Sequence, residues 1–232
     1  MAKFILNRPD DSQILSPGKI IGTTLIWFVI LMLGAVLMRV ICVAGYMTQG
    51  INPMELTRFG GDPTNYFGKP FWRVLLKLMV IAPVVEEVMF RLGLSFKRQT
   101  VALWAGLLPL VSAYYLCRCR AWYVLLGIAA VGAVLYWLIC RFTSDEQWKS
   151  WRTKYIIPAM WISAIGFGLM HLRAFSVLNG QVFPYALATI LVPMAGGCAI
   201  TYLRVNRGFW WGVLLHCLIN LPGVILIATS IK

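Results

Sequence analysis

Long apolar runs recur along almost the whole sequence, and they restrict the folds that the chain can adopt. A helix needs about 20 predominantly apolar residues to cross the roughly 30 Å of hydrocarbon in a bilayer. Runs of this kind occupy residues 20–47, 71–96, 100–117, 121–142, 155–175, 184–203 and 209–231. They predict an all-α, multi-pass transmembrane helical bundle of about seven spans, or eight if a short interfacial or re-entrant helix is present.

Composition and charge also indicate a membrane protein. Apolar residues make up 60% of the chain and charged residues only 12%, whereas charged residues make up about 25% of a soluble domain. Lys and Arg lie mostly in the short connections between runs, so the net charge of +13 indicates topology signals and headgroup anchors rather than nucleic-acid binding. Their distribution favours a cytoplasmic N-terminus, and the short chain with minimal loops favours a bacterial cytoplasmic (inner) membrane.

The runs also suggest how the chain is divided. We expect a polar N-terminal arm at residues 1–19, without a signal-peptide pattern, followed by one membrane domain at residues 20–232. Residues 48–70 and 143–154 are expected to be loops, the first with a short helix at 54–59. The third and fourth runs are separated only by residues 118–120, which predicts an antiparallel hairpin. Because neither run contains an acid or a histidine, the hairpin is expected to be scaffold.

A few polar side chains interrupt the apolar runs. Of the eight acidic residues, Glu86 and Glu87 are the only two inside a run, and both histidines of the chain, His171 and His216, are also in runs, as is Asn220. An ionisable group at the centre of a membrane helix costs roughly 2.5 to 3.5 kcal/mol on insertion scales, so it needs a partner or a function. We therefore expect these side chains to meet in one site inside the bilayer, built by the second, fifth and last spans.

Helical spacing arranges these side chains on common faces. Glu87 and Arg91 are four residues apart, so Arg91 can neutralise Glu87. This pairing leaves Glu86 as a carboxylate available for general-base catalysis. His216 and Asn220 are also four apart, which brings an imidazole and an amide to one face of the last span.

Two kinds of hydrolytic chemistry are compatible with this set. Peptide hydrolysis needs a localised water, a base that takes its proton, and donors that stabilise the developing oxyanion. The alternative is a metal ion: one carboxylate and two imidazoles can bind zinc and leave a position open for water. The sequence leaves the metal, possibly zinc, undecided, and its ligands would be Glu86, His171 and His216.

Three short motifs follow one another in the chain. They are E-E-x-x-x-R at residues 86–91, F-x-x-x-H at 167–171 and H-x-x-x-N at 216–220, each on a long apolar run. This ordered set resembles the CPBP family of intramembrane proteases, the CAAX protease and bacteriocin-processing group also called Abi. The resemblance implies a helical-bundle endopeptidase whose substrate is a peptide or protein, such as a lipidated C-terminus or a bacteriocin precursor. By this resemblance, the site residues are Glu86 and His171 for water activation, His216 and Asn220 for the scissile carbonyl or a metal ion, and Glu87 and Arg91 for the shape of the site.

Other functions remain open from the sequence. Intramembrane acids and histidines also occur in proton-coupled transporters, although the chain shows no inverted repeat. A catalytically silent family member acting as a bacteriocin-immunity or binding scaffold is a further alternative. In an alternative interpretation, Asn220 has no part in the chemistry and only forms a hydrogen bond to a neighbouring helix. Other intramembrane protease classes fit less well, because the chain lacks the H-E-x-x-H motif of metalloproteases and Ser95 lacks the glycine that follows a rhomboid-like nucleophile.

Overall fold

The computed structural model describes residues 16–52, 70–175 and 178–230. The elements in these ranges are all helical, which confirms the predicted fold class. In chain order they are α2 (Pro17–Met47), α4 (Phe71–Leu76), η2 (Lys77–Ile81), α5 (Ala82–Arg91), η3 (Leu92–Ser95), α6 (Arg98–Val111), η4 (Ser112–Leu116), α7 (Trp122–Phe142), α8 (Asp145–Met170), η5 (His171–Ala174), α9 (Phe183–Arg207) and α10 (Phe209–Ser230). The η elements are single turns of π-helix (η2, η4) or 3₁₀ helix (η3, η5).

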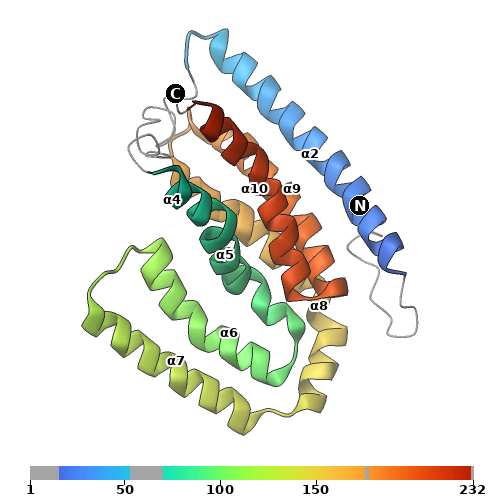
Figure 1. Cartoon of the computed structure of the whole chain (residues 1–232), viewed down its shortest axis with the longest axis vertical. Helices are drawn as coiled ribbons and strands as arrows, with labels where there is room; N and C mark the ends of the chain where they lie inside the picture. The colour runs from blue at the N-terminus through green and yellow to red at the C-terminus, as the bar shows by residue number, and fades with distance from the viewer. Residues whose placement is uncertain (1–15, 53–69, 176–177, 231–232) are drawn as a thin grey trace.

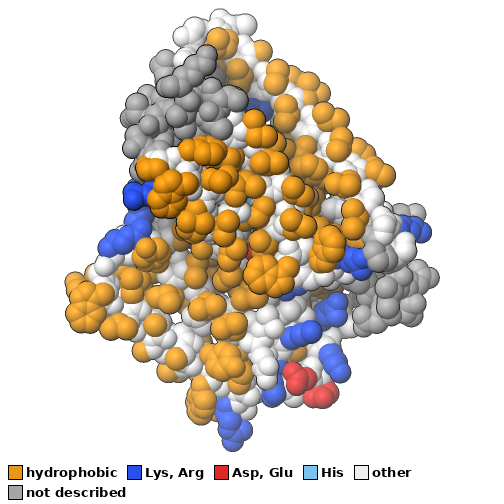
Figure 2. All heavy atoms as spheres, viewed as in Figure 1, with side chains coloured by type: hydrophobic (Ala, Val, Ile, Leu, Met, Phe, Trp, Pro, Cys, Tyr) orange, Lys and Arg blue, Asp and Glu red, His pale blue; other side chains and the backbone are white. Residues whose placement is uncertain are grey.

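Among the described residues, five helices are long and apolar enough to cross a membrane: Gly18–Met47, Arg98–Leu116, Trp122–Phe142, Asp145–Ala174 and Phe183–Arg207. The shorter apolar helix Phe209–Ile225 and the broken helix α4–η2–α5 lie alongside them. These segments correspond to the seven apolar runs of the sequence. Apolar side chains cover most of the face in Figure 2, as expected for a surface in contact with lipid.

Helix α9 lies at the centre of the bundle. In its apolar segment 67% of the residues are buried, against 6% in α2 and in α7. Helices α2, α8 and α10 all pack against α9, and the core between α8, α9 and α10 includes Met160, Ile200 and Leu215. Figure 1 shows α2 on one side of this group and the α6–α7 pair on the other.

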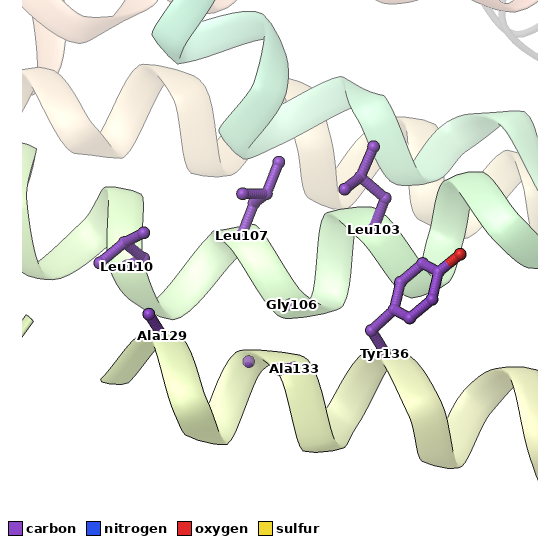
Figure 3. Close-up of a pocket in the computed structure, with 8 residues that line it drawn as sticks. Leu103, Gly106, Leu107, Leu110, Ala129, Ala133 and Tyr136 are labelled. Carbon is purple, nitrogen blue, oxygen red and sulfur yellow. The ribbon is translucent and has the colours of Figure 1, made fainter. Parts of the chain in front are cut away.

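The predicted antiparallel hairpin is confirmed as α6 and α7, and two glycines set how closely its helices approach. A Cβ atom on Gly132 would lie 2.3 Å from the carbonyl oxygen of Gly106, and one on Gly106 would lie 2.8 Å from that of Gly132. Only a residue without a side chain permits this contact between backbones. A cavity of about 290 Å³ lies between the two helices, lined by Leu103, Gly106, Leu107, Leu110, Ala129, Gly132, Ala133 and Tyr136 (Figure 3).

The second span is interrupted by a π-helical turn, and Pro83 accounts for it. Within η2 the backbone N–H of Ala82 bonds to the carbonyl of Lys77, five residues earlier. Proline has no N–H to continue this pattern, so the carbonyl of Leu78, five residues before Pro83, receives no bond from it. Asn220 on α10 donates its side-chain N–H to that carbonyl instead, at 2.9 Å. The break in the helix is therefore also the point where α10 attaches.

Two expected boundaries are wrong and one expected helix is not described. Residues 145–154 form the start of α8 rather than a loop, because Ser144 and Gln147 cap each other and acidic residues occupy the first turn. Helix α2 begins inside the predicted polar arm, with Ser16 as its cap and Pro17 at its first position. The expected short helix at 54–59 lies outside the described residues.

Candidate active site

The predicted pairing of Glu87 with Arg91 is confirmed, and the pair is fully buried. Arg91 Nη1 contacts Glu87 Oε1, and both side chains are 0% exposed. Arg91 Nε also donates to Thr201 Oγ1 on α9 at 3.0 Å, and the guanidinium lies 4.5 Å from the centre of the Phe167 ring. Arg91 therefore connects the helix of the paired glutamates to α9 and, through Phe167, to α8.

Two glycines make room for this ion pair. A Cβ atom on Gly197 would lie 3.2 Å from Arg91 Nη2, and one on Gly212 would lie 3.1 Å from Glu87 Oε2. These are the two atoms of the pair that are buried without a hydrogen-bond partner in the described structure. A larger residue at either glycine would press directly on the charged groups.

His216 lies between the two carboxylates. Its Nδ1 is 3.0 Å from Glu87 Oε1, and its Nε2 is 3.5 Å from Glu86 Oε2. An ionised carboxylate can only accept a hydrogen bond, so Nδ1 carries a proton and donates it to Glu87. Nε2 consequently faces Glu86, at a distance longer than the roughly 2.7 to 3.2 Å of a direct hydrogen bond. Glu86 is thus near His216 without being fixed by it.

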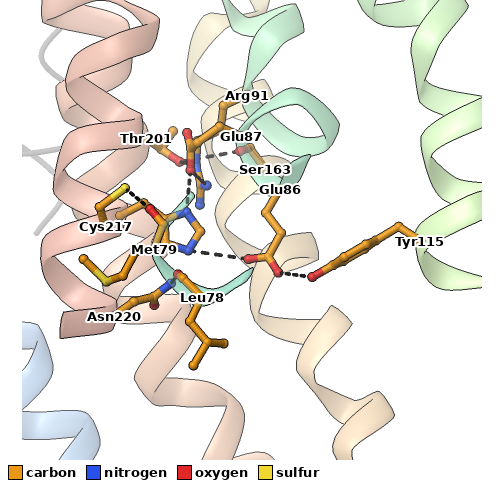
Figure 4. Close-up of polar contacts among 11 residues, drawn as sticks. Leu78, Met79, Glu86, Glu87, Arg91, Tyr115, Ser163, Thr201, Cys217 and Asn220 are labelled. Carbon is orange, nitrogen blue, oxygen red and sulfur yellow. Dashed lines mark hydrogen bonds and ion pairs between the residues drawn. The ribbon is translucent and has the colours of Figure 1, made fainter. Parts of the chain in front are cut away.

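Glu86 has a second neighbour that the sequence did not indicate. The hydroxyl of Tyr115 donates to Glu86 Oε1 at 3.0 Å, and Figure 4 shows the two side chains pointing toward each other. Tyr115 lies on η4, at the end of the hairpin that we expected to be scaffold only. That expectation is wrong, because one side chain of the hairpin reaches the site.

His171 is the first residue of η5 and approaches the site from α8. Its Nδ1 is 2.8 Å from the carbonyl oxygen of Phe167, and since a carbonyl only accepts, Nδ1 carries a proton and donates it. In the neutral form of the ring, Nε2 then keeps a lone pair. The Phe167 ring makes edge contacts with both histidines, at 5.0 Å from His171 and 5.3 Å from His216.

Asn220 has a structural contact. Its Nδ2 donates to the carbonyl of Leu78, and one turn earlier the thiol of Cys217 donates to the carbonyl of Met79, also at 2.9 Å. Both bonds join α10 to η2, as Figure 4 shows. Asn220 therefore joins two helices, a contact of the kind that the sequence analysis named as an alternative to a catalytic role.

The charges in this cluster can balance. Glu86 and Glu87 each carry a negative charge when ionised, while Arg91 and a protonated His216 each carry a positive one. Moving one proton from His216 Nε2 to Glu86 removes one charge of each sign, so the sum stays at zero. Such a transfer adds no net charge to a region where an unbalanced charge is costly.

The described side chains do not assemble a complete metal site. In the parts of the chain that the structure describes, no group of three or more His, Cys, Asp or Glu residues is arranged to hold a metal ion. A structural or catalytic zinc site needs at least three protein ligands. The suggested ligands Glu86 and His216 face each other, but His171 does not complete the set in this geometry.

Three polar residues at the site could not be found from the sequence. Tyr115 and Thr201 are single polar residues in apolar helices, and nothing in their spacing separates them from other such residues. Ser163, whose hydroxyl is 3.5 Å from that of Thr201, belongs to the same group. Tyr115 and Thr201 contact motif residues on other helices, and Ser163 contacts Thr201, and a sequence pattern does not record such contacts.

Comparison with known proteins supplies the family. The family model of type II CAAX prenyl endopeptidase Rce1-like proteins matches residues 68–222, a range that includes all three motifs. The chain belongs to this family. As a member of the CAAX endopeptidase family with several long apolar helices, it is a multi-pass membrane protein of a protease family. A search of curated proteins and a search of solved structures found no match.

Proposed function

We propose that this protein is an intramembrane endopeptidase that cleaves prenylated peptides with a CAAX-type C-terminus, using a water molecule activated by Glu86. The observation that carries the proposal is the contact between Glu86 Oε2 and His216 Nε2, at 3.5 Å inside a buried cluster. The substrate class follows from the family, whose name is that of a prenyl endopeptidase.

In the first step, Glu86 acts as the general base. A water held between Glu86 and the lone pair of His171 Nε2 loses a proton to Glu86, and its oxygen bonds to the carbonyl carbon of the scissile peptide. The carbonyl oxygen becomes an oxyanion. Protonated His216 stands next to Glu86 and can donate Nε2–H to that oxyanion.

In the second step, Glu86 acts as the general acid. The tetrahedral intermediate collapses, the C–N bond breaks, and the proton on Glu86 passes to the leaving nitrogen. The products are a carboxylic acid and an amine, and Glu86 and His216 return to their starting states. The proposed steps use no metal ion.

The remaining motif residues hold this pair in place. Glu87 and Arg91 fix Nδ1 of His216, so that Nε2 is the nitrogen presented to Glu86. Asn220 fastens the same helix to η2 one turn further on. We therefore assign Glu87, Arg91 and Asn220 to positioning rather than to contact with the reacting atoms.

The proposal is tested with purified protein in proteoliposomes and a farnesylated CAAX peptide. We expect mass spectrometry to show release of the C-terminal tail, and we expect His171→Ala and His216→Ala to lower the rate by about 100-fold or more. Cleavage should persist after treatment with a zinc chelator. A wild-type protein that leaves the peptide intact but takes up protons with a solute would instead indicate a transporter.

A further inference from the structure

In the described structure, the hydroxyl of Tyr115 joins the α6–α7 hairpin to Glu86. It donates to Oε1, while His216 faces Oε2. Each oxygen of the carboxylate is therefore assigned to a different neighbour. The two oxygens of a carboxylate are equivalent, so these two contacts fix the plane of the group, with one oxygen toward Tyr115 and the other toward His216.

The ring of Tyr115 is itself held from another element. The guanidinium of Arg173 lies 5.0 Å from its centre. Arg173 is on η5, two residues after His171. One 3₁₀ turn thus carries both the histidine expected to hold the water and the cation that packs on the tyrosine.

Tyr115 is also in a distinctive backbone setting. It lies within η4, a π-helical turn at the end of α6. A π-helical turn contains one residue more than an α-helical turn, which changes the direction of the side chains that follow. Such turns are frequent at functional sites. Here the π turn follows α6 and carries the tyrosine that reaches Glu86.

We propose that Tyr115 is a positioning residue for catalysis, which fixes the plane of the Glu86 carboxylate so that its second oxygen meets the water and His216, and that Arg173 holds the tyrosine ring in place. This inference rests on the proposed function of Glu86 as general base. Tyr115 does not touch the substrate in this assignment. Its loss lowers the rate of the chemical step without weakening substrate binding.

The chain supplies a matched control in the preceding residue. Tyr114 is on the same π turn, and its ring packs on a guanidinium too, that of Arg120 at 3.9 Å. The Tyr114 backbone carbonyl also accepts a hydrogen bond from Arg120 Nη1. Comparing Tyr115→Phe with Tyr114→Phe therefore removes one hydroxyl from each of two similar tyrosines, only one of which bonds Glu86.

In the peptide cleavage assay, we expect Tyr115→Phe to lower kcat about tenfold or more, the usual effect of losing a hydrogen bond to a charged group, with KM within about twofold of wild type. Tyr114→Phe should leave both constants unchanged. Arg173→Ala should lower kcat by a smaller factor than Tyr115→Phe. Arg120→Ala should leave kcat unchanged. Equal kcat values for the two tyrosine variants would overturn the inference while leaving the proposed function intact.

A second measurement does not depend on peptidase activity. Dicyclohexylcarbodiimide is an apolar reagent that modifies carboxyl groups inside membranes, and peptide mass spectrometry reports modification at Glu86, with Glu86→Gln as the unlabelled reference. Because the phenol occupies Oε1, we expect Glu86 to be modified several-fold faster in Tyr115→Phe than in Tyr114→Phe or wild type. Identical rates in the three proteins would show that Tyr115 does not hold the carboxylate.

Discussion

At the scale of single residues, the buried Glu87–Arg91 pair is a structural requirement as well as part of the site. Replacing Arg91 with Met leaves Glu87 as a buried charge without its cation, which typically costs about 3 to 5 kcal/mol. We expect Arg91→Met to lower the thermal unfolding temperature in detergent, and Glu87→Gln/Arg91→Met to recover part of the loss. Lys149→Met, on the exposed surface of α8, is the control and should have little effect. A double variant less stable than Arg91→Met alone would contradict this account.

The same scale shows what the sequence could and could not predict about the site. The pairing of Glu87 with Arg91 followed from helical spacing, because the two residues lie on one helix. The contact between Glu86 and His216 joins residues on α5 and α10, so the motifs predicted the participants but not the atoms. His216 also has a structural partner in Glu87, which was not evident from its own segment. We therefore expect His216→Ala to lower stability as well as activity.

At the scale of elements, the α6–α7 hairpin depends on the contact between Gly106 and Gly132. A methyl group on Gly132 meets backbone atoms that cannot move aside, so we expect Gly132→Ala to destabilise the protein by about 1 to 3 kcal/mol. Gly127 is on the same helix with no atom within 4 Å of an added Cβ, and Gly127→Ala should be neutral or slightly stabilising. Thermal unfolding of the two variants side by side checks the prediction. Equal unfolding temperatures would show that the helices do not meet at this point.

The elements also show where sequence patterns lose information. Apolar runs placed every span, but the π turn in the second span arises from Pro83 and its missing N–H. The start of α8 at Asp145 depends on a capping box that follows a hydrophilic segment, and the segment's polarity suggested a loop. Hydropathy reports which segments are apolar, whereas these two features depend on hydrogen bonds of the backbone.

At the scale of the whole molecule, the site is assembled from segments distant in the chain. Helices α5 and α10 supply the carboxylates and His216, α8 and η5 supply Phe167 and His171, α9 supplies Thr201, and the hairpin supplies Tyr115. The matched family range, residues 68–222, covers these segments and leaves α2 outside. Helix α2 packs against α9 on the side away from the hairpin (Figure 1). It therefore encloses α9 and lies away from the side where Tyr115 enters the site.

The central claim is that the Glu86 carboxylate activates water inside this bundle. The most direct test is the initial rate of farnesylated CAAX peptide cleavage by Glu86→Gln, which keeps the shape of the side chain and removes the base. Glu146→Gln, an exposed change in the first turn of α8, serves as the control. The account predicts that Glu86→Gln folds and loses about 100-fold to 10,000-fold in kcat, while Glu146→Gln keeps the wild-type rate. Cleavage by Glu86→Gln at the wild-type rate would contradict it.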